Sequence, residues 1–98
     1  MATPARLNDE EIRRRLVGLP GWALRENKLH REFTFPDFIH AFAFMTAAAL
    51  RAEAMGHHPE WFNVYNRVVV DLATHDAQGI TRLDFDLAEH LQALASRG

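Results

Sequence analysis

Apolar positions recur along the chain at two spacings, one typical of helices and one typical of strands. Residues 38–55 and the stretch from Thr81 onward repeat them every three or four residues, which predicts two helices with apolar stripes. Residues 29–35 instead alternate between two sets of side chains, which predicts a strand. The pattern therefore predicts a protein that contains both helices and strands.

Residues that start and stop helices sharpen this prediction. Asn8 is placed to cap a first helix from about residue 9, and Asp37 is placed to cap the helix over residues 38–55. Gly56 predicts the end of that second helix, because glycine readily adopts the left-handed conformation. Thr81 and Asp84 have the spacing of a capping box, which predicts that the last helix begins there.

Strand signals occur in two pairs, one before each of the two later helices. Residues 22–25 and 29–35 form the first pair around a turn at 26–28, and residues 61–64 and 67–74 form the second around a turn at 65–66. The predicted element order is α-β-β-α-β-β-α. We expect an α+β fold, in which a four-stranded antiparallel sheet carries three helices packed on one face.

The helix predicted over residues 38–55 has an unusually wide apolar arc, made of two neighbouring stripes. One stripe consists of Phe38, Phe42, Met45, Ala49 and Ala52; the other consists of Ile39, Ala43, Thr46 and Leu50. One sheet cannot cover so wide an arc. We therefore expect the helix to contact its own sheet and also a second copy of the chain.

Length and composition bound the class of protein. The 98 residues suffice for a single domain, in which residues 1–6 are expected to form a flexible arm. Apolar residues make up 48% of the chain, but no run reaches the roughly 20 that a membrane-spanning helix needs. The first residues show no signal-peptide pattern, and cysteine is absent, so the expected location is the cytoplasm. With a formal charge of −2 and scattered basic residues, we expect no nucleic-acid partner.

Histidine placement carries most of the chemical information. The chain has six histidines, and His57 and His58 are adjacent in a segment that Pro59 holds out of the helical conformation. Glu53 lies four residues before His57, so its carboxylate could lie beside that imidazole at the end of the helix. His75 follows the last predicted strand, which can return to the same neighbourhood. Each of these residues taken alone is more often an ordinary surface residue than a catalytic one.

A zinc site is the competing functional interpretation of these histidines. Three imidazoles are enough to hold zinc and to leave a fourth position open. However, His57 and His58 are neighbours in an extended segment, so their side chains should leave on opposite sides. No histidine pair has the His-x-His or His-x-x-x-His spacing of common zinc sites in this region. We therefore expect no metal.

The segment EAMGHHPEWFNVYN at residues 53–66, followed by Thr74-His75 and Asp84, resembles the signature of the pterin-4a-carbinolamine dehydratases. The similarity extends to Gly21-Trp22, Phe38 and the segment 41–46, and so covers nearly the whole domain. The resemblance implies a four-stranded sheet with three helices, assembled as a homodimer or homotetramer. It also implies dehydration of 4a-hydroxytetrahydropterin to quinonoid dihydropterin, without a cofactor, in support of aromatic amino-acid hydroxylases such as phenylalanine hydroxylase.

The resemblance also implies which residues form the site. His57, His58 and His75 match the residues that line the family's active site, while Glu53, Pro59, Trp22 and Asp84 match residues around it.

Our hypothesis is that two of the three histidines perform the proton transfers. Histidine, with an unperturbed pKa of about 6.5, can give or take a proton near neutrality. We expect His57 and His75 to be the general acid and base, in an order that the sequence leaves open, and His58 to position the pterin. Glu53 is expected to orient His57. The alternative is a non-catalytic, oligomeric binding or coactivator protein on the same fold.

Overall fold

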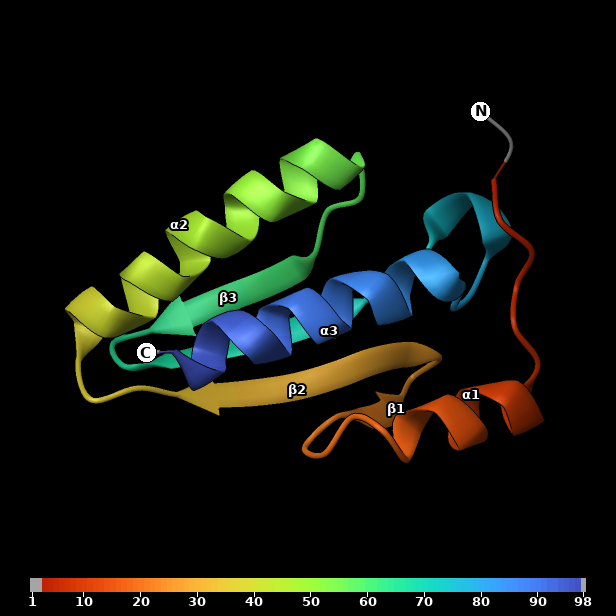
Figure 1. The fold of residues 1–98 in the computed structure, drawn as a ribbon, viewed down its shortest axis with the longest axis horizontal. Coiled ribbons are helices and arrows are strands. Elements are labelled where there is room, and N and C mark those ends of the chain that lie inside the picture. The colour runs from red at the N-terminus through yellow and green to blue at the C-terminus, as the bar shows by residue number, and fades with distance from the viewer. Residues whose placement is uncertain (1–2, 98) are drawn as a thin grey trace.

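Two β-hairpins, each followed by a helix, supply the sheet and the two longer helices (Figure 1). The structure is a computed structural model and describes residues 3–97. Its elements in chain order are α1 (Asp9–Leu16), β1 (Ala23–Arg25), β2 (Lys28–Thr34), α2 (Phe38–Met55), β3 (Glu60–Val64), β4 (Arg67–Leu72), a single 3₁₀ turn (His75–Ala77) and α3 (Arg82–Ser96). This is the predicted α+β order, with all four strands antiparallel.

Side-chain caps fix the helix ends near the predicted positions. The Asn8 side chain accepts the first cap hydrogen bond of α1, and Asp37 accepts one from the backbone N–H of His40 at 2.9 Å. Gly56 ends α2 in the left-handed conformation, with φ of 65°. The predicted capping box of Thr81 and Asp84 opens α3. The bounds of α2 are those predicted from the sequence.

The second strand of each hairpin forms the centre of the sheet, whose order is β1-β2-β4-β3. In the register of the two central strands Leu29 lies opposite Leu72, and Phe33 lies opposite Val68. All four side chains are buried beneath α2 and α3, which run side by side across the same face (Figure 1). Ile12 of α1 belongs to the same core. The prediction of helices on one face is confirmed.

The predicted strand over residues 67–74 ends earlier than expected. Strand β4 stops at Leu72, and Thr74 instead forms an isolated bridge with Gly79. This bridge closes a tight loop around the 3₁₀ turn, because the backbone N–H of Thr74 donates to the carbonyl of Gly79 at 2.8 Å. The loop holds residues 75–78 at the end of the sheet.

Helix α2 buries a stripe that shares only Ala52 with the two stripes described in the sequence analysis. The side chains that face the sheet are Ala41, Phe44, Ala48 and Ala52. Three of them are alanines, which allow the helix backbone to approach the sheet closely. Four large apolar side chains of the helix are exposed instead: Phe38, Ile39, Phe42 and Leu50.

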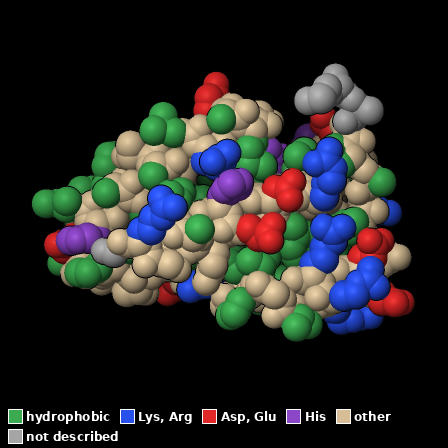
Figure 2. All heavy atoms as spheres, in the orientation of Figure 1, with side chains coloured by type: hydrophobic (Ala, Val, Ile, Leu, Met, Phe, Trp, Pro, Cys, Tyr) green, Lys and Arg blue, Asp and Glu red, His purple; other side chains and the backbone are tan. Residues whose placement is uncertain are grey.

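The surface is divided between apolar and charged regions. Figure 2 shows apolar side chains gathered over the outer side of α2, at the upper left, whereas charged side chains gather near α1, at the lower right. On the sheet face away from α2 and α3, Phe62 and Val64 of strand β3 are exposed. No helix within residues 3–97 is long and apolar enough to cross a membrane.

Candidate active site

Three of the six histidines line one pocket at the end of the sheet. His57, His58 and His75 surround a cavity of about 440 Å³, although they come from two segments that are distant in the sequence. Its other walls include Met55 at the end of α2 and Leu83 at the start of α3. The three imidazoles that were expected to lie around one site therefore line the same cavity in this structure.

The left-handed turn at Gly56 places His57. After this turn the backbone N–H of His57 donates to the carbonyl of Ala52 at 3.1 Å, so the chain folds back along the end of α2. The imidazole is thereby buried, with a relative exposure of 9%, and directed toward α3. His58, the next residue, is exposed, as expected for adjacent side chains in an extended segment.

Asp84 is the partner of the buried His57 ring. The distance from His57 Nε2 to Asp84 Oδ1 is 2.5 Å, and the Asp84 side chain is completely buried. The other carboxylate oxygen, Oδ2, accepts hydrogen bonds from the Thr74 hydroxyl and from the backbone N–H of Thr81, both at 2.8 Å. The two oxygens of the Asp84 carboxylate can therefore together accept hydrogen bonds from all three of these neighbours.

The hydrogen bonds around Asp84 run in one direction. The Thr74 hydroxyl has one hydrogen, which it donates to Asp84, so the Thr81 hydroxyl 2.7 Å away must donate to Thr74. The Thr81 oxygen in turn accepts from the backbone N–H of Leu83 at 3.2 Å. We assign the hydrogen between His57 and Asp84 to Nε2 of the imidazole, which leaves Nδ1 as the nitrogen available for proton exchange.

Glu53 contacts His58 and not His57, so the prediction that it orients His57 is wrong. The distance from His58 Nε2 to Glu53 Oε1 is 2.8 Å. The side chains of this pair are 62% and 81% exposed, respectively, and they lie at the surface beside the cavity. The spacing rule fails because α2 has ended at Gly56, so the ring of His57 no longer follows the helical repeat.

The remaining predicted residues are placed as follows. His75 begins the 3₁₀ turn and is exposed at the rim of the cavity. Pro59 follows His58 but is not among the residues that line the cavity, and neither is Trp22. The Trp22 side chain is buried in the core, where its indole N–H donates to Gln92 Oε1 at 3.1 Å. The structure therefore brings His57, His58, His75 and Asp84 together, with Glu53 beside them.

Four further polar residues belong to this region and were not singled out as site residues. Thr74 and Thr81 fix Asp84, while Asp76 and Arg82 line the cavity itself. The capping-box spacing already identified Thr81 as a neighbour of Asp84, so that part of the network had a sequence signal. Asp76 and Arg82 had none, because an isolated charged residue next to a helix start is common on protein surfaces.

A second hollow of about 320 Å³ shares Ala73, Thr74 and His75 with the histidine cavity. It also contains the ion pair of Lys28 and Glu60, whose Nζ and Oε1 atoms are 2.6 Å apart. The hydrogen bond that Lys28 donates to Glu60 raises the pKa of Lys28 above its ordinary value. A cation therefore persists on this side of His75 at any pH near neutrality.

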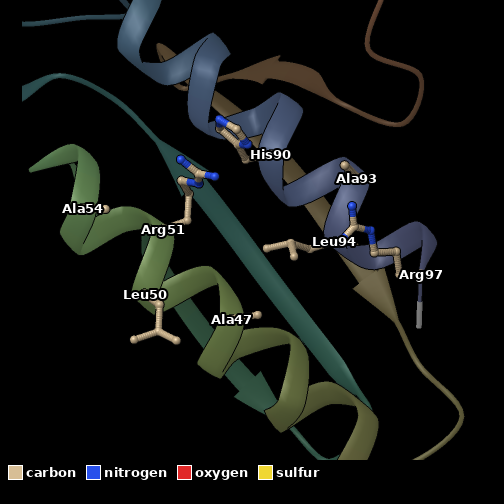
Figure 3. Close-up of a pocket in the computed structure, with 8 residues that line it drawn as sticks. All are labelled: Ala47, Leu50, Arg51, Ala54, His90, Ala93, Leu94 and Arg97. Atoms are coloured by element: carbon tan, nitrogen blue, oxygen red, sulfur yellow. The ribbon is translucent and has the colours of Figure 1, made fainter.

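The groove between α2 and α3 is a separate cavity of similar size, about 440 Å³ (Figure 3). Its lining includes Ala47 and Ala93, while Arg51 and His90 approach each other from the two helices, as Figure 3 shows. Its lining residues include one histidine, two arginines and no carboxylate. This groove thus lacks the paired groups that acid–base chemistry needs.

Residues 3–97 contain no group of three or more His, Cys, Asp or Glu side chains arranged to hold a metal ion. What the histidine cavity does offer is proton transfer. A buried imidazole whose orientation is fixed by a carboxylate lies in the same cavity as an exposed imidazole. Such a pair suits a reaction in which one atom gains a proton while another loses one.

Comparisons with known proteins identify the family of this chain. Residues 5–94 match the model of the family described as pterin 4 alpha carbinolamine dehydratase. Two relatives are provisionally named pterin-4-alpha-carbinolamine dehydratases. One, from Solibacter usitatus, is 60% identical over 91 residues, with 93% of this chain and 96% of the relative covered. The other, from Rhizobium leguminosarum, is 51% identical over 94 residues, with 94% and 93% covered.

Solved structures show the same architecture. A transcriptional coactivator/pterin dehydratase from Brucella melitensis superposes with a TM-score of 0.90 at 48% identity, covering 92% of this chain and 98% of that one. A pterin dehydratase-like protein identified as a RuBisCO assembly factor in the alpha-carboxysome has a TM-score of 0.64 at 23% identity, covering 76% and 86%, which shows the shared fold alone. On the strength of the family model and these relatives, the chain belongs to the pterin 4 alpha carbinolamine dehydratase family.

Proposed function

We propose that this protein removes water from 4a-hydroxytetrahydropterin to give the quinonoid dihydropterin. The reaction breaks the bond between C4a and the hydroxyl oxygen, which leaves as water after gaining a proton. The lone pair of N5 forms the new double bond to C4a, and N5 loses its proton. One general acid and one general base therefore suffice, and no cofactor is needed.

The observation that carries the proposal is the buried hydrogen bond between His57 and Asp84 in a cavity shared with His75. In this proposal Nδ1 of His57 is the base that takes the N5 proton, because the Asp84 carboxylate stabilises the positive charge that forms on the ring. His75, exposed to solvent, protonates the departing hydroxyl and is reprotonated from water. His58 positions the pterin.

The test is a coupled reaction with phenylalanine hydroxylase, in which the 4a-hydroxy intermediate is followed by its ultraviolet absorbance. Adding the purified protein should accelerate its decay, and His57→Ala and His75→Ala should each remove roughly 10²–10⁴-fold of that acceleration. His90→Ala is the matched control, because His90 lines the other cavity. If both cavity variants kept the wild-type rate while folded, the catalytic assignment would be wrong.

The same experiment separates the dehydratase from the alternative, a non-catalytic binding protein. The Brucella relative carries both descriptions in its name, as a transcriptional coactivator and as a pterin dehydratase. A binding protein would leave the decay of the intermediate unchanged. Acceleration that requires His57 and His75 would support the enzyme, and we propose a role in tetrahydropterin recycling in the cytoplasm alongside an aromatic amino-acid hydroxylase.

We further propose that the chain forms a homodimer or homotetramer through α2. Ile39 and Leu50 on the outer side of this helix are 75% and 71% exposed, which is unusual for large apolar side chains grouped on one surface. Analytical ultracentrifugation should show an oligomer, and Ile39→Glu should shift it toward the monomer. Arg13→Glu, a charge change on the exposed side of α1, is the control.

A further inference from the structure

The groove between α2 and α3 gathers basic side chains and no acid. Arg51 and His90 approach each other near one end of the groove, and Arg97 lies at the other end (Figure 3). Within residues 3–97 the structure gives neither Arg51 nor His90 a hydrogen-bond partner or a carboxylate within 4.0 Å. Both side chains therefore have donors available to an anion placed between them.

The sequence around Arg51 explains why it has no partner on its own helix. Residues three and four positions away are neighbours on a helix surface. For Arg51 all four are uncharged: Ala47, Ala48, Ala54 and Met55. The acid nearest along the chain, Glu53, comes two residues later and so lies on the opposite side of α2, where it contacts His58. The Arg51 guanidinium is thus left to face the groove.

His90 is also left without an acidic partner. The carboxylate four residues before it on α3 belongs to Asp86, which is paired with Arg82, with Nη1 and Oδ2 3.7 Å apart. The His90 side chain is half-buried in the wall of the groove. Even the neutral imidazole has one N–H, so His90 can donate a hydrogen bond to an anion without being charged.

The rest of the groove is aliphatic. Besides the three basic residues, its lining consists of alanines and leucines: Ala47, Leu50, Ala54, Ala93 and Leu94. None of these offers a ring on which a flat ligand could stack. The lining spans residues 47–54 on α2 and 90–97 on α3, which is about 10 Å along each helix. The volume of about 440 Å³ is in the range of small-molecule sites.

We propose that this groove binds an aliphatic carboxylate of medium chain length, with its carboxylate between Arg51 and His90 and its hydrocarbon chain along the alanines and leucines. A guanidinium donates two parallel hydrogen bonds to a carboxylate, and the imidazole N–H can add a third. The single negative charge is matched by Arg51 alone. A phosphate monoester has close to two charges near neutrality, and a neutral His90 would leave the second one unmatched.

The test measures binding of octanoate to the purified protein by isothermal titration calorimetry, with octan-1-ol and butanoate as comparison ligands. The alcohol has the same chain without the charge and should bind at least about tenfold more weakly. Butanoate keeps the charge but lacks four CH₂ groups, so it should bind roughly 10- to 200-fold more weakly. Together the two comparisons show whether both halves of the groove are used.

Arg51→Gln should weaken octanoate binding about 10- to 100-fold and remove most of the preference over octan-1-ol, because glutamine keeps a donor but loses the charge and the paired N–H groups. Arg13→Gln, the same change on the exposed side of α1, is the matched control and should bind octanoate as the wild type does. Shifts of the Ala47 and Ala93 methyl resonances should place the ligand in the groove.

The inference is overturned if the wild-type protein shows no preference for octanoate over octan-1-ol, or if Arg51→Gln retains that preference. The other possible occupant of the groove is a second copy of the chain. Analytical ultracentrifugation of Arg51→Gln tests it: a smaller oligomer, together with no octanoate binding by the wild type, would assign the groove to a contact between copies and would equally overturn the inference.

Discussion

Replacing Asp84 by asparagine removes the charge next to His57 with almost no change in volume. In the native protein Oδ1 of Asp84 accepts from His57 Nε2, while Oδ2 accepts from the Thr74 hydroxyl and the Thr81 N–H. An asparagine side chain has only one oxygen, so it can serve one side and not both. The two donors on the threonine side favour placing the oxygen there, which turns the NH₂ group toward His57.

The expected loss of activity follows from the proton on the ring. Facing an NH₂ group, Nε2 of His57 must become an acceptor, so the ring proton moves to Nδ1 and blocks the nitrogen that takes the N5 proton in the proposed mechanism. We expect kcat to fall by roughly 10²–10⁴-fold, the usual contribution of one proton-transfer group. The loss of a hydrogen bond to a charged acceptor should cost about 1.5–3 kcal/mol of stability. A domain of this size has about 5–15 kcal/mol, so the variant should remain folded.

Glu53→Gln is the matched comparison, because it makes the same chemical change in the other histidine–carboxylate pair of the site. That pair is largely exposed, with 81% of the Glu53 side chain accessible, so its contribution to stability should be about 0–1 kcal/mol. We expect its kcat to fall by less than about tenfold.

Decay of the 4a-hydroxypterin intermediate would give kcat, and urea unfolding followed by circular dichroism would give stability. Equal losses of kcat in the two variants, or wild-type turnover by a folded Asp84→Asn protein, would refute the argument that the buried carboxylate sets the reactive tautomer.

Two further predictions concern the scaffold. Gly21 and Gly56 both have positive φ, 90° and 65°, but a Cβ at Gly21 would run into the Arg31 guanidinium, whereas one at Gly56 would meet nothing within 4 Å. The Arg31 guanidinium would have to give up its hydrogen bonds to the Pro20 carbonyl and to Gln92 Oε1 in order to make room. Urea unfolding should therefore show a larger loss of stability for Gly21→Ala than for Gly56→Ala, for which backbone strain alone predicts roughly 1–2 kcal/mol; equal losses would refute the role of the clash. The backbone N–H of His40 holds the pKa of Asp37 below its ordinary value. The ionised Asp37 cap therefore stabilises the folded protein fully above the unfolded-state pKa of about 3.9, and this stabilisation is lost as the pH falls through the lower folded-state pKa. Asp37→Asn keeps the cap oxygen without titrating, so wild-type stability should decline more steeply than that of the variant below about pH 4, and parallel pH profiles would contradict this.

Local signals allowed the element order and the helix ends to be predicted. The ends of α2 depend on Asp37 and Gly56, whose effects act over three or four residues and can be read without knowing the rest of the fold. Which side of α2 faces the sheet could not be predicted in this way. The side of α2 that is buried is the one whose alanines let the helix backbone approach the sheet closely. Hydrophobicity alone would have predicted burial of Phe42 and Leu50, which are exposed.

The candidate site could likewise be predicted only in part. Glu53 and His57 have the spacing of a helical pair, but the left-handed turn between them turns His57 away, so that Glu53 contacts His58 instead. The true partner of His57, Asp84, is distant in the sequence and reaches it only because the start of α3 packs against the end of α2. Trp22 was expected near the site on the resemblance alone; the structure shows its side chain buried in the core and bonded to Gln92.

The strand order β1-β2-β4-β3 bears on how the chain assembles during synthesis. Strand β4 is the last strand made, yet it lies between β2 and β3 and pairs with both. A nascent chain that has only reached Tyr65 therefore has no sheet larger than the first hairpin, and isolated hairpins are marginal in water. Leu29 and Phe33 remain without their partners Leu72 and Val68 until that strand emerges, so the domain is expected to fold in one late, cooperative step after most of the polypeptide has left the ribosome.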